Sequence, residues 1–161
     1  MNTKLTNKGF TIIEVVLVLA IAGLIFLMVF VALPALQSGQ RDTARKSDVS
    51  NVAAAVTSYA NNNRGAFPTT AQLQTQLGMA GSGSTATFNG VSTNTTSISV
   101  RTATAGTAFT VPDATIYVVK GMKCNTVNAN GSVTLASGTT RQFVSVTRLE
   151  GGNSTGYCLD S

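Results

Sequence analysis

The chain has 161 residues, 43% of them hydrophobic, 11% charged and 6% aromatic, with a formal net charge of +5, no His, no Trp and 2 Cys. Without His, acid–base catalysis near neutral pH lacks its usual agent and the commonest metal ligand is missing. The 6 acidic residues are scattered along the chain, so we expect no enzyme, no catalytic residue, no metal site and no cofactor. An average globular chain holds roughly a quarter charged residues, so the charge deficit must have a local origin.

The first predicted element is a membrane-spanning helix behind a short basic leader. Val15 to Leu36 contains no charged side chain, and these 22 residues would extend about 33 Å as a helix, enough for a hydrocarbon layer of about 30 Å. Lys4 and Lys8 precede it without an acid, which keeps the N-terminus cytoplasmic and sends the rest of the chain outward. A protease that cuts after Gly9 would remove the leader and leave the helix on the mature chain, unlike a secretory signal peptidase.

Glu14 is the acidic residue at the margin of this apolar run. Such a group costs up to about 2.5 to 3.5 kcal/mol if drawn to mid-bilayer, which makes it a functional candidate that needs a partner. Cleavage after Gly9 creates that partner, because the new amine of Phe10 is a cation. The pair, within one chain or between neighbouring subunits, would set axial register more than add stability. The alternative is a Glu that snorkels at the edge of an unprocessed signal anchor.

Residues 8–23, KGFTIIEVVLVLAIAG, resemble the N-terminus of type IV pilins and their relatives. In that family a prepilin peptidase cuts after the Gly of the leader and methylates the new N-terminal residue, commonly Phe, and a Glu follows four residues later. The resemblance implies cleavage between Gly9 and Phe10, N-methylation of Phe10 and a role for Glu14 in subunit assembly. It also implies bacterial origin.

The helix is predicted to continue beyond the membrane as an amphipathic stalk, about 50 residues long in total. One face carries apolar residues at helical spacing and must be covered: Val49, Val52, Ala53, Val56, Tyr59 and Ala60. The charged positions are interpreted as a solvated face, with Asp42 and Lys46 as an i, i+4 pair: Arg41, Asp42, Arg45, Lys46 and Asp48.

The helix is expected to stop in Asn61–Gly65, where Gly65 can adopt the left-handed conformation. Thr69 or Thr70 then caps a short helix that runs through Leu77. The letters YANNNRGAFP, residues 59–68, also resemble the helix-to-loop transition of pilins and pseudopilins.

Residues 80–161 are predicted to form β structure, most simply a meander packed on the apolar helix stripe. The expected strands are Ala86–Val91, Ser97–Arg101, Ala108–Val111, Thr115–Lys120, Ser132–Leu135, Gln142–Leu149 and Gly156–Leu159. Turn signals separate them at Asn89-Gly90, Asn130-Gly131 and Gly151-Gly152-Asn153.

Cys124 and Cys158 lie 34 positions apart in a region expected outside the cytoplasm, where thiols oxidise, so a disulfide is predicted. It would close the C-terminal loop and contribute about 3 to 4 kcal/mol. The resemblance implies that such a stapled region serves subunit contacts or adhesion. The alternative is simple stabilisation.

The basic excess invites a nucleic-acid hypothesis. Without Lys4 and Lys8, nine basic residues face six acidic ones, a net charge of +3, spread without a cluster or interleaved aromatics. An assembled fibre would repeat this small charge, so weak DNA binding by the fibre is kept as a hypothesis beside a plain solubility role.

Together these features predict an α+β, pilin-like fold: a long N-terminal helix packed against a small C-terminal antiparallel β-sheet domain. The expected parts are a leader (1–9), a transmembrane and assembly half-helix (10–36), an amphipathic half-helix (37–65) and a β-rich head (66–161). The leading hypothesis is a type IV pilus subunit that supports adhesion, motility or DNA uptake. The alternatives are a pseudopilin or minor pilin of a type II secretion or competence machine, and a monomeric membrane-anchored binding protein.

The resemblance also implies partners and a location. The partners are other copies of the chain and other pilins, the prepilin peptidase, the inner-membrane assembly machinery and, before assembly, membrane lipid. The protein would lie in the cytoplasmic membrane with its head outside, and later in an extracellular pilus on the cell surface.

Overall fold

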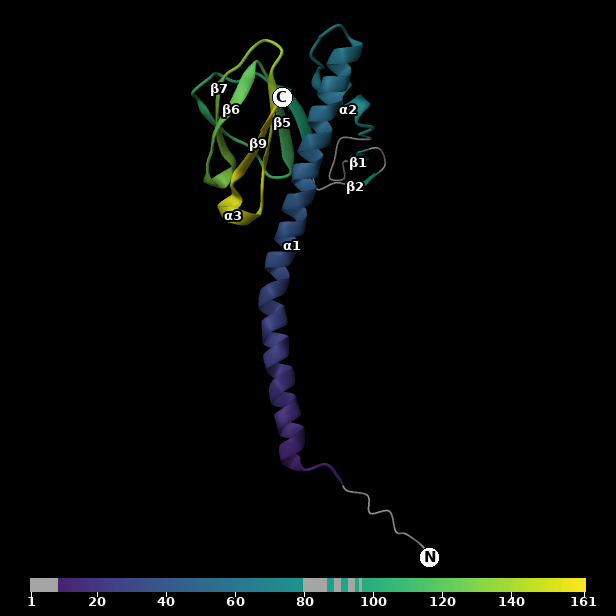
Figure 1. Cartoon of the computed structure of the whole chain (residues 1–161), viewed down its shortest axis with the longest axis vertical. Coiled ribbons are helices and arrows are strands. Elements are labelled where there is room, and N and C mark those ends of the chain that lie inside the picture. Colours follow the sequence, from purple (N-terminus) through teal and green to yellow (C-terminus); the bar gives the residue numbers. More distant parts are fainter. Residues whose placement is uncertain (1–8, 80–86, 89–90, 93–94, 96) are drawn as a thin grey trace, which may run out of the picture. The chain divides into compact units, whose positions relative to one another are not determined.

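The computed structural model describes residues 9–79, 87–88, 91–92, 95 and 97–161. The chain divides into two compact units, Met1–Gln37 and Ser38–Ser161. Helix α1 (Ile12–Asn62) has 51 residues and runs through the boundary between them (Figure 1). Its length matches the helix of about 50 residues predicted from the sequence. It is also long and apolar enough to cross a membrane.

In the first unit, the large apolar side chains from Phe10 to Leu36 are all exposed, from 45% for Val29 and Leu33 to 85% for Phe10 and Ile12. A soluble monomer rarely exposes apolar surface on this scale, so this part of α1 requires lipid or other helices around it.

In the second unit, α1 buries one stripe and ends where the sequence predicted. Val49, Val52 and Val56 are fully buried at the expected helical spacing. The helix stops at Asn62, and Gly65 follows with φ +84°, a conformation that glycine adopts without steric cost. The short helix α2 (Thr70–Gln76) begins with a capping box in which Thr69 and Gln72 satisfy each other's backbone N–H groups.

The strands of the second unit form two main sheets and a small hairpin. The four-stranded sheet has the order β3-β5-β8-β9 and the three-stranded sheet the order β4-β7-β6. The first comprises β3 (Ser97–Arg101), β5 (Thr115–Lys120), β8 (Phe143–Arg148) and β9 (Gly156–Asp160). The second comprises β4 (Ala108–Thr110), β6 (Met122–Val127) and β7 (Ser132–Ser137), and the hairpin comprises β1 (Thr87–Phe88) and β2 (Val91–Ser92). Two short helical turns, η1 (Ala129–Gly131) and α3 (Gly151–Ser154), complete the order.

The predicted meander is wrong, because β3 and β5 pair in parallel. A parallel pair needs a crossover rather than a hairpin, and here the chain leaves the first sheet to form β4 in the second. The other described pairings are antiparallel, so the antiparallel-rich α+β class is confirmed.

One predicted strand is wrong, and one observed strand was not predicted. The expected strand Ala86–Val91 is replaced by β1 and β2, which pair antiparallel, and the predicted turn at residues 89–90 lies outside the described residues. Strand β6 was not predicted, because its segment MKCNTV is mostly exposed and lacks a regular apolar alternation.

The core has two parts, on the two faces of the four-stranded sheet. Ile116 and Val118 of β5 pack with the valines of α1, whereas Val119 packs in the cluster that holds Val133 and Leu135 of β7. The order of layers is therefore helix, sheet, sheet. Strand β5 is buried on both faces, which explains its nearly continuous apolar sequence.

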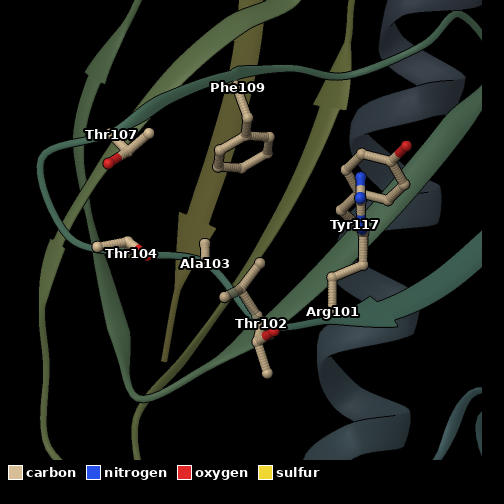
Figure 2. Close-up of a pocket in the computed structure, with 8 residues that line it drawn as sticks. Arg101, Thr102, Ala103, Thr104, Thr107, Phe109 and Tyr117 are labelled. Atoms are coloured by element: carbon tan, nitrogen blue, oxygen red, sulfur yellow. The ribbon is translucent and has the colours of Figure 1, made fainter.

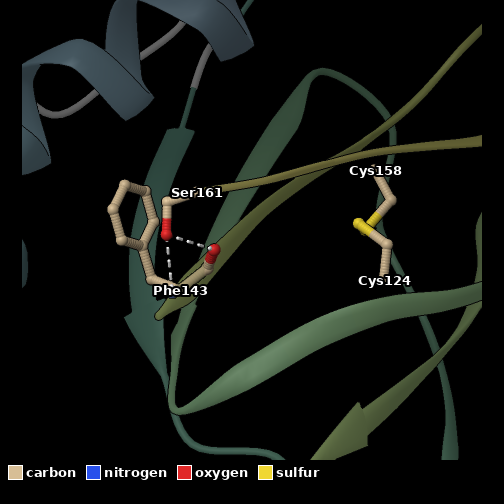
Figure 3. Close-up of a disulfide and its surroundings, with 4 residues drawn as sticks. All are labelled: Cys124, Phe143, Cys158 and Ser161. Carbon is tan, nitrogen blue, oxygen red and sulfur yellow. Dashed lines mark hydrogen bonds between the residues drawn. A yellow bond between two sulfur atoms is a disulfide. The ribbon is translucent and has the colours of Figure 1, made fainter. Parts of the chain in front are cut away.

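The predicted disulfide between Cys124 and Cys158 is confirmed, and it joins β6 of one sheet to β9 of the other (Figure 3). The two Cα atoms are 6.0 Å apart, within the usual range for a disulfide. The bond therefore staples the two sheets in addition to closing the C-terminal segment.

Candidate functional site

The predicted processing site lies just ahead of α1. Gly9 and Phe10 are exposed and precede the first helical residue, Ile12. A Cβ atom added to Gly9 would meet nothing within 4 Å. The fold of this chain therefore does not itself require glycine at position 9, and a requirement for it would have to come from an enzyme that binds the segment.

Glu14 lies in the first turn of α1, and its backbone N–H donates to the Thr11 carbonyl over 3.1 Å. Its side chain is exposed and forms no ion pair with any residue that the structure describes. Glu14 and Phe10 are four positions apart, about 6 Å along a helix axis. If the helix continued back to Phe10, an amine created there would lie just over one turn before the carboxylate, the spacing at which two positions share one helix face.

A second cluster lies where α1 packs against the head, and it corrects the sequence interpretation. Arg45 and Asp48 are 3% and 6% exposed, so the charged face of the helix is not simply solvated. Arg45 Nη1 donates to Asp113 Oδ1 at 2.8 Å and to the Arg148 carbonyl at 2.7 Å, and Nη2 donates to Glu150 Oε1 at 2.7 Å. One buried guanidinium therefore ties the helix to two loops of the head.

Asp42 adds a further attachment between the helix and the head. We call the whole cluster the clamp, and define it as Arg41, Asp42 and Arg45 of α1 with Asp113 and Glu150 of the head. The Asp42 carboxylate accepts the backbone N–H groups of Glu150 at 2.6 Å and Gly151 at 2.8 Å rather than pairing with Lys46 as predicted. A Cβ at Gly151 would lie 2.8 Å from Asp42 Oδ2, so a larger residue there would push the Asp42 carboxylate out of this position. Arg41 Nε completes the clamp at 2.5 Å from Glu150 Oε2.

The sequence did contain a signal for the clamp. Asp42, Arg45, Val49 and Val52 follow one another at intervals of three or four residues, so both charged residues continue the buried valine stripe. The acidic partners are more than 60 positions away, and no local pattern marks them.

Asp48 is the other buried charged residue of α1. Burial raises the pKa of its carboxyl above the ordinary value of 3.8, although the hydroxyl of Thr95, which donates to Oδ2 at 2.8 Å, and the nearby charge of Arg45 both act to lower it. The ionised carboxylate therefore costs stability in the folded state, because desolvation outweighs its favourable contacts.

We expect the Asp48→Asn variant to gain stability relative to the wild type as pH rises. A folded pKa above the unfolded value means that the wild type binds the proton more tightly when folded. Its free energy of unfolding falls as pH rises from 3.8 through the raised folded pKa, and the Asn variant, which keeps an oxygen for Thr95, escapes this fall. Urea unfolding of the full chain in detergent across this pH range measures the difference. The exposed Asp160→Asn matches the change in net charge, and an equal trend there would contradict the assignment to burial.

Among the described residues, no group of three or more His, Cys, Asp or Glu side chains is placed to hold a metal ion.

Residues 4–30 match a family model described as the prokaryotic N-terminal methylation motif. This motif is the class III signal peptide of type IV pilins, so the resemblance noted in the sequence is confirmed for that segment. No match was found among curated proteins or solved structures.

Proposed function

We propose that the chain is a non-catalytic structural subunit of a type IV pilus, cut after Gly9, methylated at Phe10 and polymerised through α1. The methylation motif supports a type IV pilin-like or pseudopilin protein, and it implies processing by a prepilin peptidase and assembly into pilus-like fibres. The proposal that the chain assembles through α1 rests on one combination. The motif lies on the apolar half of α1, where the large apolar side chains up to Leu36 are all exposed, while the second unit carries its own core.

The exposed apolar half of α1 supports two successive locations for the protein, first the membrane and then the fibre. Motif and helix together fit anchoring in the membrane before assembly. In a filament the same apolar surface would pack against neighbouring helices instead of lipid, so one surface would serve both states. The inner-membrane assembly machinery would carry out the transfer, and adhesion, motility or DNA uptake would be properties of the surface fibre.

The mass of the membrane-extracted protein tests the processing step. We expect a mature chain that begins at Phe10 with one added methyl group, and fibres on the cell surface that contain it by mass spectrometry. The Gly9→Leu variant should keep its leader, since a bulky residue would obstruct the peptidase while nothing in the chain itself resists it. A wild-type mass that begins at Met1 would exclude the proposal, and unchanged processing of the variant would place the cut elsewhere.

A further inference from the structure

Basic residues that appear dispersed in the sequence gather around one groove of the head, which corrects the expectation that they form no cluster. A groove of about 400 Å³ is lined by Arg64, Lys120 and Arg141, among others. Arg64 follows the end of α1, Lys120 ends β5, and Arg141 lies between β7 and β8. Three segments far apart in the sequence thus each contribute one exposed cation.

A second hollow adjoins the first and adds another cation. Phe67 and Lys120 line both hollows, and Arg101 lines the second. The Lys120 ammonium lies 5.8 Å from the centre of the Phe67 ring, and the Arg101 guanidinium lies 4.6 Å from that of Tyr117 (Figure 2). We call these two adjoining hollows the basic groove, defined as Arg64, Phe67, Arg101, Lys120 and Arg141.

The four cations of the basic groove form no ion pair with any acidic residue that the structure describes. All six acidic residues belong to the described part of the chain, and the ion pairs found there involve only Arg41 and Arg45 with Asp113 and Glu150. Arg45 is 17 residues before the end of α1, which places the clamp about 26 Å along the helix from that end. The negative charge of the clamp is thus remote from the groove.

Ser161 also lines the first hollow, where its hydroxyl accepts the Phe143 N–H at 3.1 Å beside the Phe143 ring (Figure 3). The adjacent Asp160 lines neither hollow.

We propose that the basic groove binds the phosphodiester backbone of DNA. Several unpaired cations in two adjoining hollows suit a polymer with regularly repeated charges better than a single small anion. Three of the four are Arg, whose planar guanidinium matches phosphate oxygens in pairs. Contacts to the backbone alone carry no base information, so binding is independent of sequence. The inference rests on the proposed function in one respect: a fibre would repeat the groove and bind DNA by many weak contacts.

Fluorescence anisotropy of a labelled DNA duplex with the full, processed chain in non-ionic detergent tests the groove. We expect the logarithm of the affinity to fall with the logarithm of salt with a slope of about −3.6, as four phosphate contacts require. Arg141→Glu should weaken binding by about 10-fold or more and make the slope shallower by about 1, and Arg141→Lys should restore most of both.

Lys123→Glu is the matched control, because Lys123 is an exposed cation outside both hollows and the change in charge is the same. Equal weakening in both Glu variants would overturn the proposal in favour of general charge attraction. Heparin that competes as well as unlabelled DNA at equal charge would overturn the assignment to nucleic acid. Electron microscopy of the same variants separates the two proposals. Fibres without DNA binding refute the groove alone, and groove-dependent binding without fibres refutes the pilus subunit alone.

Discussion

Replacement of Glu14 by Ala should leave removal of the leader intact and reduce the amount of assembled fibre by about 100-fold. In a bundle of apolar helices, the amine of a processed Phe10 would lie in a low dielectric and lose its counter-ion. Breaking a buried ion pair costs about 3 to 5 kcal/mol, and each 1.4 kcal/mol is a tenfold change in affinity. Fibres sheared from cells and quantified by immunoblot, with the mass of the membrane-bound chain, measure both effects.

The matched control for Glu14 is Glu14→Gln, which keeps length and hydrogen bonding but not charge. We expect it to assemble almost as poorly as the Ala variant, because the proposed role depends on the negative charge. In cells that also produce wild-type subunits, we expect the variant to be excluded from the fibres. Normal fibres from the Ala variant would refute the pairing role.

Replacement of Arg45 by Ala should lower the free energy of unfolding of the second unit by about 3 kcal/mol, which for a unit of this size is roughly a 10 °C fall in Tm. The loss removes three hydrogen bonds from a guanidinium that is 3% exposed. It also leaves the Arg148 carbonyl and the half-buried Glu150 short of a partner. Thermal unfolding of the full chain in detergent, followed by circular dichroism, measures the change.

Arg41→Ala is the control for Arg45, because both side chains contact Glu150. The Arg41 side chain is 44% exposed, so its ion pair is screened by water and should contribute less than about 1 kcal/mol. An equal loss of stability in both variants would show that burial does not strengthen the Arg45 contacts. The ratio of the stability losses in the two variants therefore tests whether the buried contacts of Arg45 stabilise the fold, because both variants remove the same charge from the helix.

The helices were predictable because their signals are local. Thr69 and Gln72 stand three positions apart and cap each other, and Gly65 ends α1 through its own backbone conformation. The valine stripe at positions 49, 52 and 56 identified the buried face of the stalk from spacing alone. The strand Thr115–Lys120 was predicted to the residue, because burial on both faces leaves a continuous apolar segment.

Other features depend on contacts between segments that are distant in the sequence, which no local pattern predicts. The parallel pairing of β3 with β5 requires the chain to visit a second sheet between them, and strand periodicity contains no information about the direction of pairing. Strand β6 carries too few buried residues to show an alternation. The disulfide was predictable as a bond between Cys124 and Cys158, but its placement between two sheets was not.

The sequence by itself was sufficient for the methylation motif, the apolar half of α1 and the prediction that Glu14 needs a partner. Each of these depends on neighbouring residues and on the difference between lipid and water. Only the tertiary structure decided which charged side chains are buried in ion pairs and which lie together at the surface. It buried Arg45 against acids more than 60 positions away and gathered Arg64, Lys120 and Arg141 around one groove. Charge acts through space, so its partners are determined by how the sheets fold back on α1 and not by order along the chain.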